Sequence, residues 1–205
     1  MTFSSLRATL LGLAAAIAAS SAAAAPVTID FNGRAADGTF TRTTDTTFTE
    51  DGFTFTANGV IQNIVDNDFN AALAPFDDDL YMFNGSGAQL TITATSGGTF
   101  NFLGLDYATA FDSDGRLEFT GVIAEGGSAY DAVDTTASAP TTYTATGYMG
   151  LSSLTISAMA DGTFPIFDNI VLEENAIGAS DVPLPAAAPL LLAGLGGLVA
   201  LRRRR

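Results

Sequence analysis

The sequence predicts an all-β fold, a single antiparallel β-sandwich of jelly-roll-like type. Apolar and polar residues alternate over many short runs, which is the pattern of strands with one buried face. Asn-Gly and Asp-Gly dipeptides separate these runs, and both favour tight turns. Between the two termini, no segment shows the spacing of an amphipathic helix. Many short strands joined by such turns favour a sandwich.

The expected strands follow one another along the chain. In the first, Val27, Ile29 and Phe31 alternate with polar residues. The same period recurs at Phe53/Phe55, Leu90/Ile92/Ala94, Phe100/Phe102, Leu117/Phe119 and Leu154/Ile156/Ala158, and a last strand covers 164–172. The turn dipeptides begin at Asn32, Asp37, Asp51, Asn58, Asn84, Asp114 and Asp161. Thr39–Thr56 is rich in threonine but interrupted by phenylalanines, so we expect edge strand and loop there.

The N-terminal 25 residues predict a secretory signal peptide. Arg7 gives a positive start, Ala8–Ala19 is an apolar helix-forming stretch, and Ser20–Ala25 supplies small residues for cleavage. The expected partners are the Sec translocon and signal peptidase. The position of the cut stays open, because Pro26 is a poor neighbour for a scissile bond.

The C-terminal segment predicts a transmembrane helix over 182–201. Val182–Leu201 carries no charge, and twenty residues at about 1.5 Å each span roughly 30 Å, the thickness of a bilayer core. Arg202, Arg203, Arg204 and Arg205 follow directly, so this end is expected in the cytoplasm. The preceding chain is then expected on the far side of the membrane.

This C-terminal block resembles the VPLPA-CTERM variant of the PEP-CTERM sorting signals of Gram-negative bacteria. The resemblance rests on the signature Val182, Pro183, Leu184, Pro185 and Ala186, followed by the apolar helix and the arginine cluster. It implies recognition by an exosortase, a membrane protease that removes the helix and passes the body to the cell surface or exterior. The alternative is a tail anchor that is never cut. The layout is then signal peptide 1–25, β-sandwich 26–176, linker 177–181 and sorting signal 182–205.

Composition excludes several classes of function. Outside the terminal segments the basic residues are Arg34, Arg42 and Arg116, against 22 acidic residues. The net charge of this part of the chain is therefore near −19. Such a surface repels nucleic acids and anionic lipids, so membrane contact is expected only through the C-terminal helix. The chain has no Cys, His, Lys or Trp. Disulfides, His-containing catalytic triads, His or Cys zinc sites and Schiff-base lysines are therefore excluded.

The run Phe164–Leu172 resembles the closing strand of exported jelly rolls and carbohydrate-binding modules. The resemblance implies a structural calcium ion held by Asp168 together with Asp30 or Asn32 near the first strand. Asp168 is expected to share a strand face with Ile166, Ile170 and Leu172, where an unpaired charge is costly and a cation or hydrogen-bond donors would relieve it. The alternative is that Asp168 accepts hydrogen bonds from backbone NH groups at a turn.

Two further groups of acidic residues are candidate sites. Asp66 and Asp68, followed by Asp77–Asp79, bracket a loop that would hold a cation or line a sugar site, unless it is simply a solvated acidic loop. Asp112–Gly115 imitates the start of an EF-hand loop, but the rest of that motif is missing, so a hairpin turn is expected.

Two functional hypotheses follow. The first is a non-catalytic exported protein of the cell surface or extracellular matrix that binds glycans or contributes structurally to an exopolysaccharide layer. Its sugar-stacking candidates are Tyr130, Tyr143 and Tyr148, unless these are ordinary half-buried strand tyrosines. The alternative is a glycan-cleaving enzyme, which would need two carboxyl groups about 5 to 10 Å apart across a cleft.

Overall fold

The computed structural model describes residues 24–69, 76, 78–111, 114–136, 140–159 and 162–175. Residues 1–23 of the predicted signal peptide lie outside these residues, and so do the linker 177–181 and the whole sorting signal 182–205 with its predicted helix and arginine cluster. Those predictions stay untested. Within the described part, no helix has the length and apolar character needed to cross a membrane.

The described chain is built almost entirely of antiparallel strands, which confirms the predicted all-β class. The strands are β1 (Val27–Ile29), β2 (Phe40–Arg42), β3 (Thr47–Glu50), β4 (Phe53–Ala57), β5 (Gln62–Val65), β6 (Leu80–Phe83), β7 (Gln89–Ala94), β8 (Phe100–Thr109), β9 (Gly115–Ile123), β10 (Ser128–Thr135), β11 (Thr141–Thr144), β12 (Leu151–Ala158) and β13 (Pro165–Glu174). One short 3-10 helix, η2 (Asn67–Phe69), follows β5.

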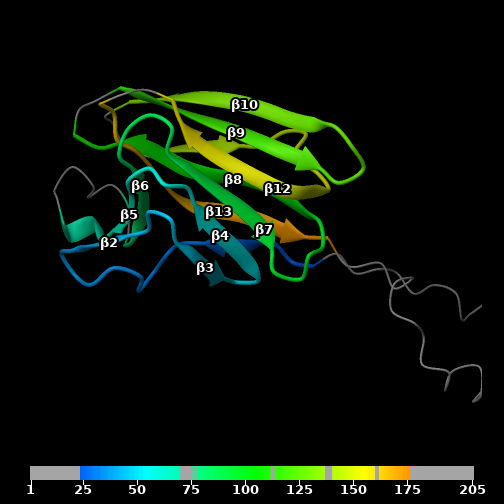
Figure 1. Ribbon diagram of the computed structural model, residues 1–205, viewed down its shortest axis with the longest axis horizontal. Helices are drawn as coiled ribbons and strands as arrows, with labels where there is room; N and C mark the ends of the chain where they lie inside the picture. The colour runs from blue at the N-terminus through cyan, green and yellow to red at the C-terminus, as the bar shows by residue number, and fades with distance from the viewer. Residues whose placement is uncertain are drawn as a thin grey trace, which may run out of the picture. The chain divides into compact units, whose positions relative to one another are not determined.

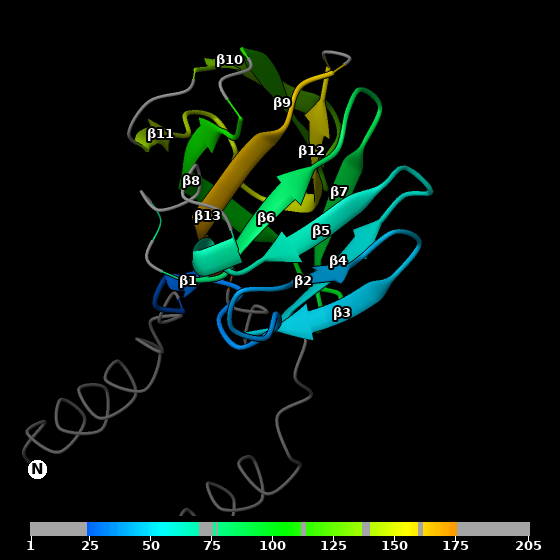
Figure 2. The same ribbon diagram turned by 90° about the vertical axis from the view of Figure 1, so that its left-hand side faces the viewer.

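The strands form two facing layers (Figures 1 and 2). The first layer runs β2-β5-β6-β13-β8, with β1 paired to β13 and β11 paired to β8. The second runs β3-β4-β7-β12, with β9 paired to β12 and β10 to β9. A single bridge between Leu151 of β12 and Phe100 of β8 joins the layers at one edge. Both ends of this strand order, β2 and β3, come from the threonine-rich segment that was expected to supply edge strands.

The main core lies between the two layers and includes most of the side chains that the alternation predicted to be buried. Phe31 is at its aromatic centre, with its ring against Phe48, Phe55, Tyr81 and Phe167. The other buried predicted residues are Ile29, Phe53, Leu90, Ile92, Ala94, Phe100, Phe102, Leu117, Phe119, Leu154, Ile156 and Ala158. Each comes from a run with a period of two, because successive strand side chains point to opposite faces.

A second, smaller core covers part of the outer face of the first layer. It contains Val65, Leu80, Met82, Ala108, Ala110 and Ile166 from the strands and their ends, with Phe76 from the connection between β5 and β6. Because of this second core, the middle of the first layer is buried on both faces. All four residues of β5 and all four of β6 are accordingly buried.

A bulge at Asn169 interrupts the alternation of β13. The pairing of β13 with β8 shifts register after Asp168, and Asn169 has a positive φ of 51°. Ile166 therefore faces the smaller core, whereas Ile170 and Leu172 face the main core. The expectation that Asp168 shares a face with Ile170 and Leu172 is wrong, because the extra residue reverses the direction of the side chains that follow.

The segment around Asp114-Gly115 is not the expected hairpin turn. β8 and β9, on either side of it, are not paired with each other, since β9 pairs with β10 and β12. Gly115 is instead the first residue of β9 and lies opposite Thr135 of β10. The dipeptide therefore belongs to a crossover between the two layers.

Candidate functional site

A groove of about 380 Å³ lies on the outer face of the first layer. Its walls come from β1, β8, β11 and β13, and they include hydroxyl, amide and carboxylate residues beside aliphatic ones. The residues that line it are Thr28, Leu103, Gly104, Leu105, Asp106, Thr142, Tyr143, Thr144, Asn169 and Val171. Leu105 and Tyr143 also belong to the main core. Strand pairing therefore places residues from four distant parts of the sequence in one hollow.

Gly104 forms the floor of this groove. It lies in a row across four strands, because Thr28 pairs with Val171, Val171 with Gly104, and Gly104 with Thr144. A Cβ atom at this position would lie 2.2 Å from the carbonyl oxygen of Tyr143. Only glycine allows β8 and β11 to approach this closely.

Asp106 is fixed by the neighbouring strands on both sides. Its Oδ1 accepts a hydrogen bond of 2.6 Å from Thr142 Oγ1 of β11, and its Oδ2 accepts one of 3.2 Å from Asn169 Nδ2 at the bulge. Each carboxylate oxygen is thus engaged before any ligand arrives. The groove presents a preorganised polar wall instead of mobile side chains.

Asp168 lies directly opposite Asp106 in the pairing of β13 with β8. Its side chain is only 3% exposed, and its Oδ1 has no hydrogen-bond partner. Burial raises the pKa of Asp168 to about 7, and the negative charges of Asp30 and Asp106 add to the rise, against a backbone hydrogen bond that lowers it. The carboxyl group therefore holds its proton well above the ordinary range of an aspartate.

Asp30, the other residue of the predicted calcium pair, accepts a hydrogen bond from its own loop. Its Oδ1 accepts a 3.1 Å hydrogen bond from the backbone NH of Asn32. The negative charge of Asp30 contributes to the raised pKa of Asp168. Calcium binding by this pair stays a prediction, since no third carboxylate of the described residues joins them in a compact group.

The predicted stacking platform of three tyrosines is wrong for two of them. Tyr143 and Tyr148 are 8% and 2% exposed and belong to the main core. The ring of Tyr143 stacks on Phe119 at 4.6 Å, and the hydroxyl of Tyr148 donates to the carbonyl oxygen of Phe119. Both rings are buried against core aromatic side chains, so the two residues do not form an exposed stacking platform with Tyr130.

Tyr130 lies apart from these two on the outer face of the second layer. Its side chain is 60% exposed, and its hydroxyl donates a 2.7 Å hydrogen bond to Glu118 Oε1 across β9 and β10. A stacking role for Tyr130 alone stays a prediction.

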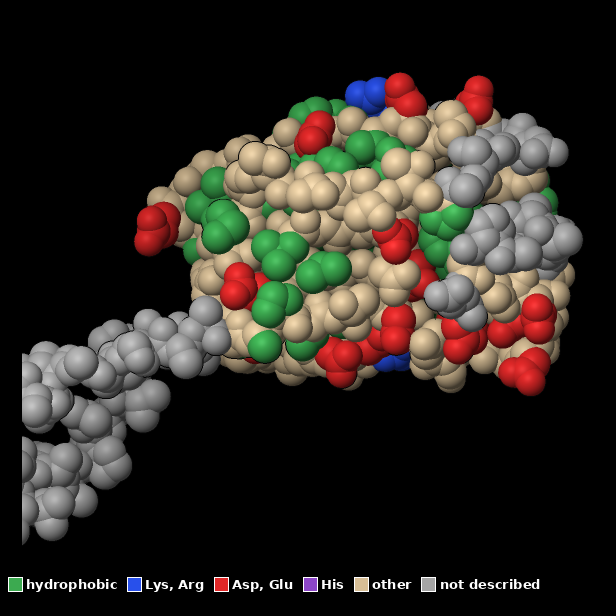
Figure 3. Space-filling model, turned by 180° about the vertical axis from the view of Figure 1, so that it is seen from behind, with side chains coloured by type: hydrophobic (Ala, Val, Ile, Leu, Met, Phe, Trp, Pro, Cys, Tyr) green, Lys and Arg blue, Asp and Glu red, His purple; other side chains and the backbone are tan. Residues whose placement is uncertain are grey.

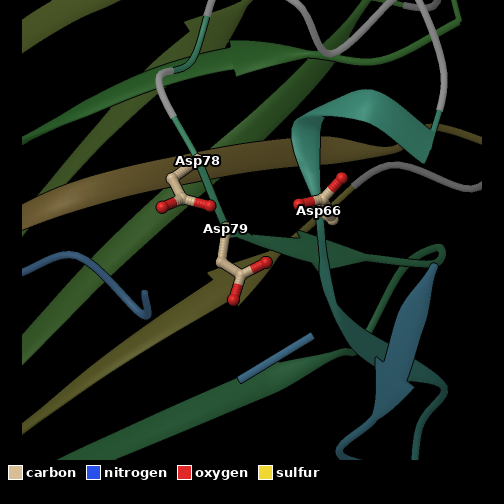
Figure 4. Close-up of side chains that lie close together, drawn as sticks. All are labelled: Asp66, Asp78 and Asp79. Carbon is tan, nitrogen blue, oxygen red and sulfur yellow. The ribbon is translucent and has the colours of Figure 1, made fainter. Parts of the chain in front are cut away.

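A second candidate site is a group of three aspartates at one end of β5 and β6 (Figure 4). Carboxylate oxygens of Asp66, Asp78 and Asp79 lie within 4.8 Å of one another. Partial desolvation and the charges of Asp79 and Asp66 raise the pKa of Asp78. Asp68 is exposed on η2 and outside the group, and Asp77 lies outside the described residues.

Negative charge dominates the surface around these sites. Acidic side chains are spread over the face seen in Figure 3, with few basic ones among them. In the described chain the ion pairs are those of Arg34 with Glu50 and of Arg116 with Glu118 and Asp134. None of these pairs includes a carboxylate of the three-aspartate group or of the groove.

Sequence reasoning did not find the groove or the role of Asp106. A glycine inside a strand is a signal of close backbone approach, and Gly104 lies inside the strand that begins at Phe100. The glycine does not, however, indicate which strand approaches β8 at this position. The groove exists because β11, β13 and β1 arrive beside β8 from distant parts of the chain.

Comparisons with known proteins give a general likeness in fold. No protein-family model and no curated protein matches the chain. Among solved structures, it resembles a family 29 carbohydrate-binding module complexed with mannohexaose, with 11% identity, a TM-score of 0.45, and coverage of 74% of this chain and 93% of that one.

Two other solved structures show a similar level of likeness. The CBM22-1 xylan-binding domain from Paenibacillus barcinonensis Xyn10C has 11% identity, a TM-score of 0.42, and coverage of 76% of this chain and 98% of that one. The agarase AgWH50C has 7% identity and a TM-score of 0.34, and the match covers 74% of this chain and 24% of the agarase. Identities and TM-scores this low support no functional assignment.

Proposed function

We propose that this chain is an exported, non-catalytic β-sandwich of jelly-roll-like type that binds a neutral polysaccharide of the cell surface or extracellular matrix. The observation that carries the proposal is the groove above Gly104, whose polar wall is fixed by the two hydrogen bonds of Asp106. Glycans offer many hydroxyl groups, and the threonine hydroxyls, the asparagine amide and the carboxylate of the groove can exchange hydrogen bonds with them.

The size and lining of the groove suit a short stretch of polysaccharide. Its volume of about 380 Å³ falls at the lower end of the roughly 300 to 1,000 Å³ typical of ligand sites. Leu103 and Val171 supply apolar surface for the CH groups of a sugar ring, which an aromatic residue often provides elsewhere. Contacts of this kind favour weak binding that is strengthened when several copies act together.

The charge of the molecule selects the class of glycan. Asp106 lies in the groove, and the surrounding chain has a large excess of carboxylates over arginines. An acidic polysaccharide would be repelled both at the groove and over the whole surface. We therefore expect neutral chains to bind and polyanionic ones to be excluded.

The alternative, a carboxylate-dependent glycan-cleaving enzyme, is less well supported. Asp106 and Asp168 do form a pair in which one pKa is raised, as such an enzyme requires. Asp168, however, is buried and is not part of the groove lining. A general acid must reach the oxygen of the bond that is cleaved, and the side chain of Asp168 does not reach the surface where a polymer would lie.

Export and sorting complete the proposal. The N-terminal segment would direct the chain to the Sec translocon and signal peptidase, and Val182–Ala186 would be recognised by an exosortase. The support for this comes from the sequence patterns at the two ends. The body would pass through a stage in which it is anchored in the inner membrane, facing the periplasm.

The test is a binding assay with the purified full-length chain and a panel of neutral polysaccharides, mannan and xylan among them, beside acidic alginate. We expect Asp106→Ala and Thr144→Val each to weaken binding to the neutral ligand by about tenfold, the effect of losing one or two hydrogen bonds. Thr91→Val, on the outer face of the second layer, is the matched control and is expected to bind normally.

Three results would contradict the proposal. Absence of binding to every neutral polysaccharide would leave a purely structural role. Equal losses of affinity in Thr91→Val and Thr144→Val would mean that the polysaccharide does not bind specifically in the groove. New reducing ends released from the ligand during incubation, and absent with Asp106→Ala, would favour the enzyme.

A further inference from the structure

The three aspartates at the ends of β5 and β6 hold two loops together. Asp66 follows β5 directly and Asp79 directly precedes β6, and the pairing of Val65 with Leu80 brings these positions side by side. Asp66 Oδ1 accepts hydrogen bonds from the backbone NH groups of Gly38 and Asp68, at 2.8 and 3.0 Å. The group thus connects the segment between β5 and β6 with the loop that follows β1.

Asp79 provides the observation that points to a ligand. Its Oδ2 accepts backbone NH bonds from Arg34 and Ala35, at 2.7 and 2.8 Å. Its Oδ1 has no partner, although the residue is only 1% exposed. An unpartnered oxygen on a buried carboxylate costs a large part of its hydration energy. One carboxylate oxygen of Asp79 lies within 4.8 Å of oxygens of Asp66 and Asp78, and Figure 4 shows the three side chains close together.

Like charges at this spacing repel one another unless something between them is positive. Three carboxylates lie within 4.8 Å, and the ion pairs of Arg34 and Arg116 in the described chain go to other acids. Two of the three side chains are buried, which weakens the screening of their repulsion by water. A bound cation would offset the repulsion and would satisfy the buried oxygen in one step.

We propose that Asp66, Asp78 and Asp79 form a calcium site that stabilises the contact between the loop after β1 and the segment joining β5 and β6. The donor set consists of carboxylate oxygens, which calcium prefers. Two of the oxygens already accept backbone NH bonds, so water would complete the coordination shell. Calcium tolerates such an irregular shell, whereas magnesium demands nearly ideal octahedral geometry.

This site differs from the pair Asp30 and Asp168 that the closing strand suggested. The three aspartates occupy the ends of β5 and β6, and Asp168 lies within β13 opposite Asp106. Neither Asp30 nor Asp168 belongs to the compact group. The proposal is also independent of glycan binding, because none of the three aspartates lines the groove.

The experiment titrates the purified full-length chain, stripped with EDTA, with CaCl₂ or MgCl₂ and follows both the heat of binding and the Tm. We expect calcium to bind and to raise the Tm more than the same concentration of magnesium, because binding to the folded state alone stabilises it. Asp78→Asn and Asp79→Asn are expected to weaken calcium binding by about tenfold or more. Asp68→Asn removes an equal charge nearby and is expected to leave the affinity unchanged.

A comparison without metal separates the site from an ordinary acidic loop. Asp78 is exposed, so Asp78→Asn should fold normally. In EDTA this variant should have a higher Tm than the wild type, because one repelling charge is gone, yet it should lose the increase that calcium gives. Equal effects of calcium and magnesium, an unchanged calcium affinity in Asp78→Asn, or loss of binding in Asp168→Asn would each overturn the proposal.

Discussion

At the scale of single residues, the buried carboxyl of Asp168 is the least expected feature of the molecule. Natural proteins seldom leave such a group without a partner, and here its Oδ1 has none. The group responds by holding its proton, as the rise of its pKa to about 7 shows. Asp168 therefore makes the stability of the fold depend on pH.

The direction of this dependence follows from the raised pKa. The folded state binds the proton of Asp168 more tightly than the unfolded state, whose pKa is near the ordinary 3.8. The free energy of unfolding should therefore decrease as the pH rises from about 4 to about 7, by up to about 1.4 kcal/mol per pH unit, and then level off. In Asp168→Asn this contribution is absent, so the variant should gain stability relative to the wild type as the pH rises.

Urea unfolding at several pH values between 4 and 8, in the presence of EDTA, measures this difference. Asp37→Asn, an exposed aspartate elsewhere, controls for the loss of one negative charge. If the stability curves of wild type and Asp168→Asn run parallel over this range, the carboxyl is ionised throughout and the assignment is wrong.

At the scale of elements, the turn between β3 and β4 shows how directly local sequence fixes a hairpin. Glu50 pairs with Phe53, so Asp51 and Gly52 alone form the connection. Both have positive φ, 42° and 86°, as the two-residue turn that matches strand twist requires. The dipeptide was predicted to be a turn for this reason.

Gly52→Ala should destabilise the fold by about 1 to 2 kcal/mol, the cost of a side chain in the left-handed region. A Cβ at this position would lie 4.0 Å from its nearest neighbour, Glu174 Oε2, so the loss is conformational and not steric. Urea unfolding measures it. Asp51→Asn keeps a residue that tolerates positive φ and should change stability by less than about 0.5 kcal/mol. Equal stability of Gly52→Ala and wild type would mean that the turn adopts another conformation.

Threonine rows on the second layer show what alternation alone predicts well. Thr56 of β4 pairs with Thr91 of β7, which pairs with Thr155 of β12, and that residue pairs with Thr120 of β9. Their neighbours along each strand, Phe55, Ile92, Ile156 and Phe119, are buried. The threonines take the outward face because the pleat leaves them no other.

At the scale of the whole molecule, the acidic charge and the absence of disulfides determine how the fold is stabilised. The chain has no cysteine, and its body holds only three arginines. Without disulfides, the fold depends on its two apolar cores and, on our proposal, on a bound cation. The calcium site would be the counterpart of a disulfide, joining loops that are distant in sequence.

Processing at both ends is the prediction that concerns the complete chain. Mass spectrometry of the native exported protein should find the N-terminus near residue 26 and the C-terminus at or shortly before the signature Val182–Ala186. Gentle conditions would also show retained calcium. An intact chain of 205 residues recovered from the cytoplasm would refute both export and sorting.

The sequence by itself determined the all-β class, the strands that contain the alternating runs, and the Asp51-Gly52 turn; β5, β6, β10 and β11 were not predicted. These features depend on period-two alternation and on backbone preferences of single residues, which act over a few positions. The same local patterns placed Phe31, Phe55 and Leu154 in the core correctly.

Only the tertiary structure decided which of these residues meet. The insertion of β13 between β6 and β8 and the bulge at Asn169 determine the surroundings of Asp168, and the pairing of β5 with β6 brings Asp66 to Asp79. The same packing buries Tyr143 and Tyr148, which the sequence suggested as a surface platform. Strand order and register depend on contacts between distant segments, and local alternation is compatible with many of them.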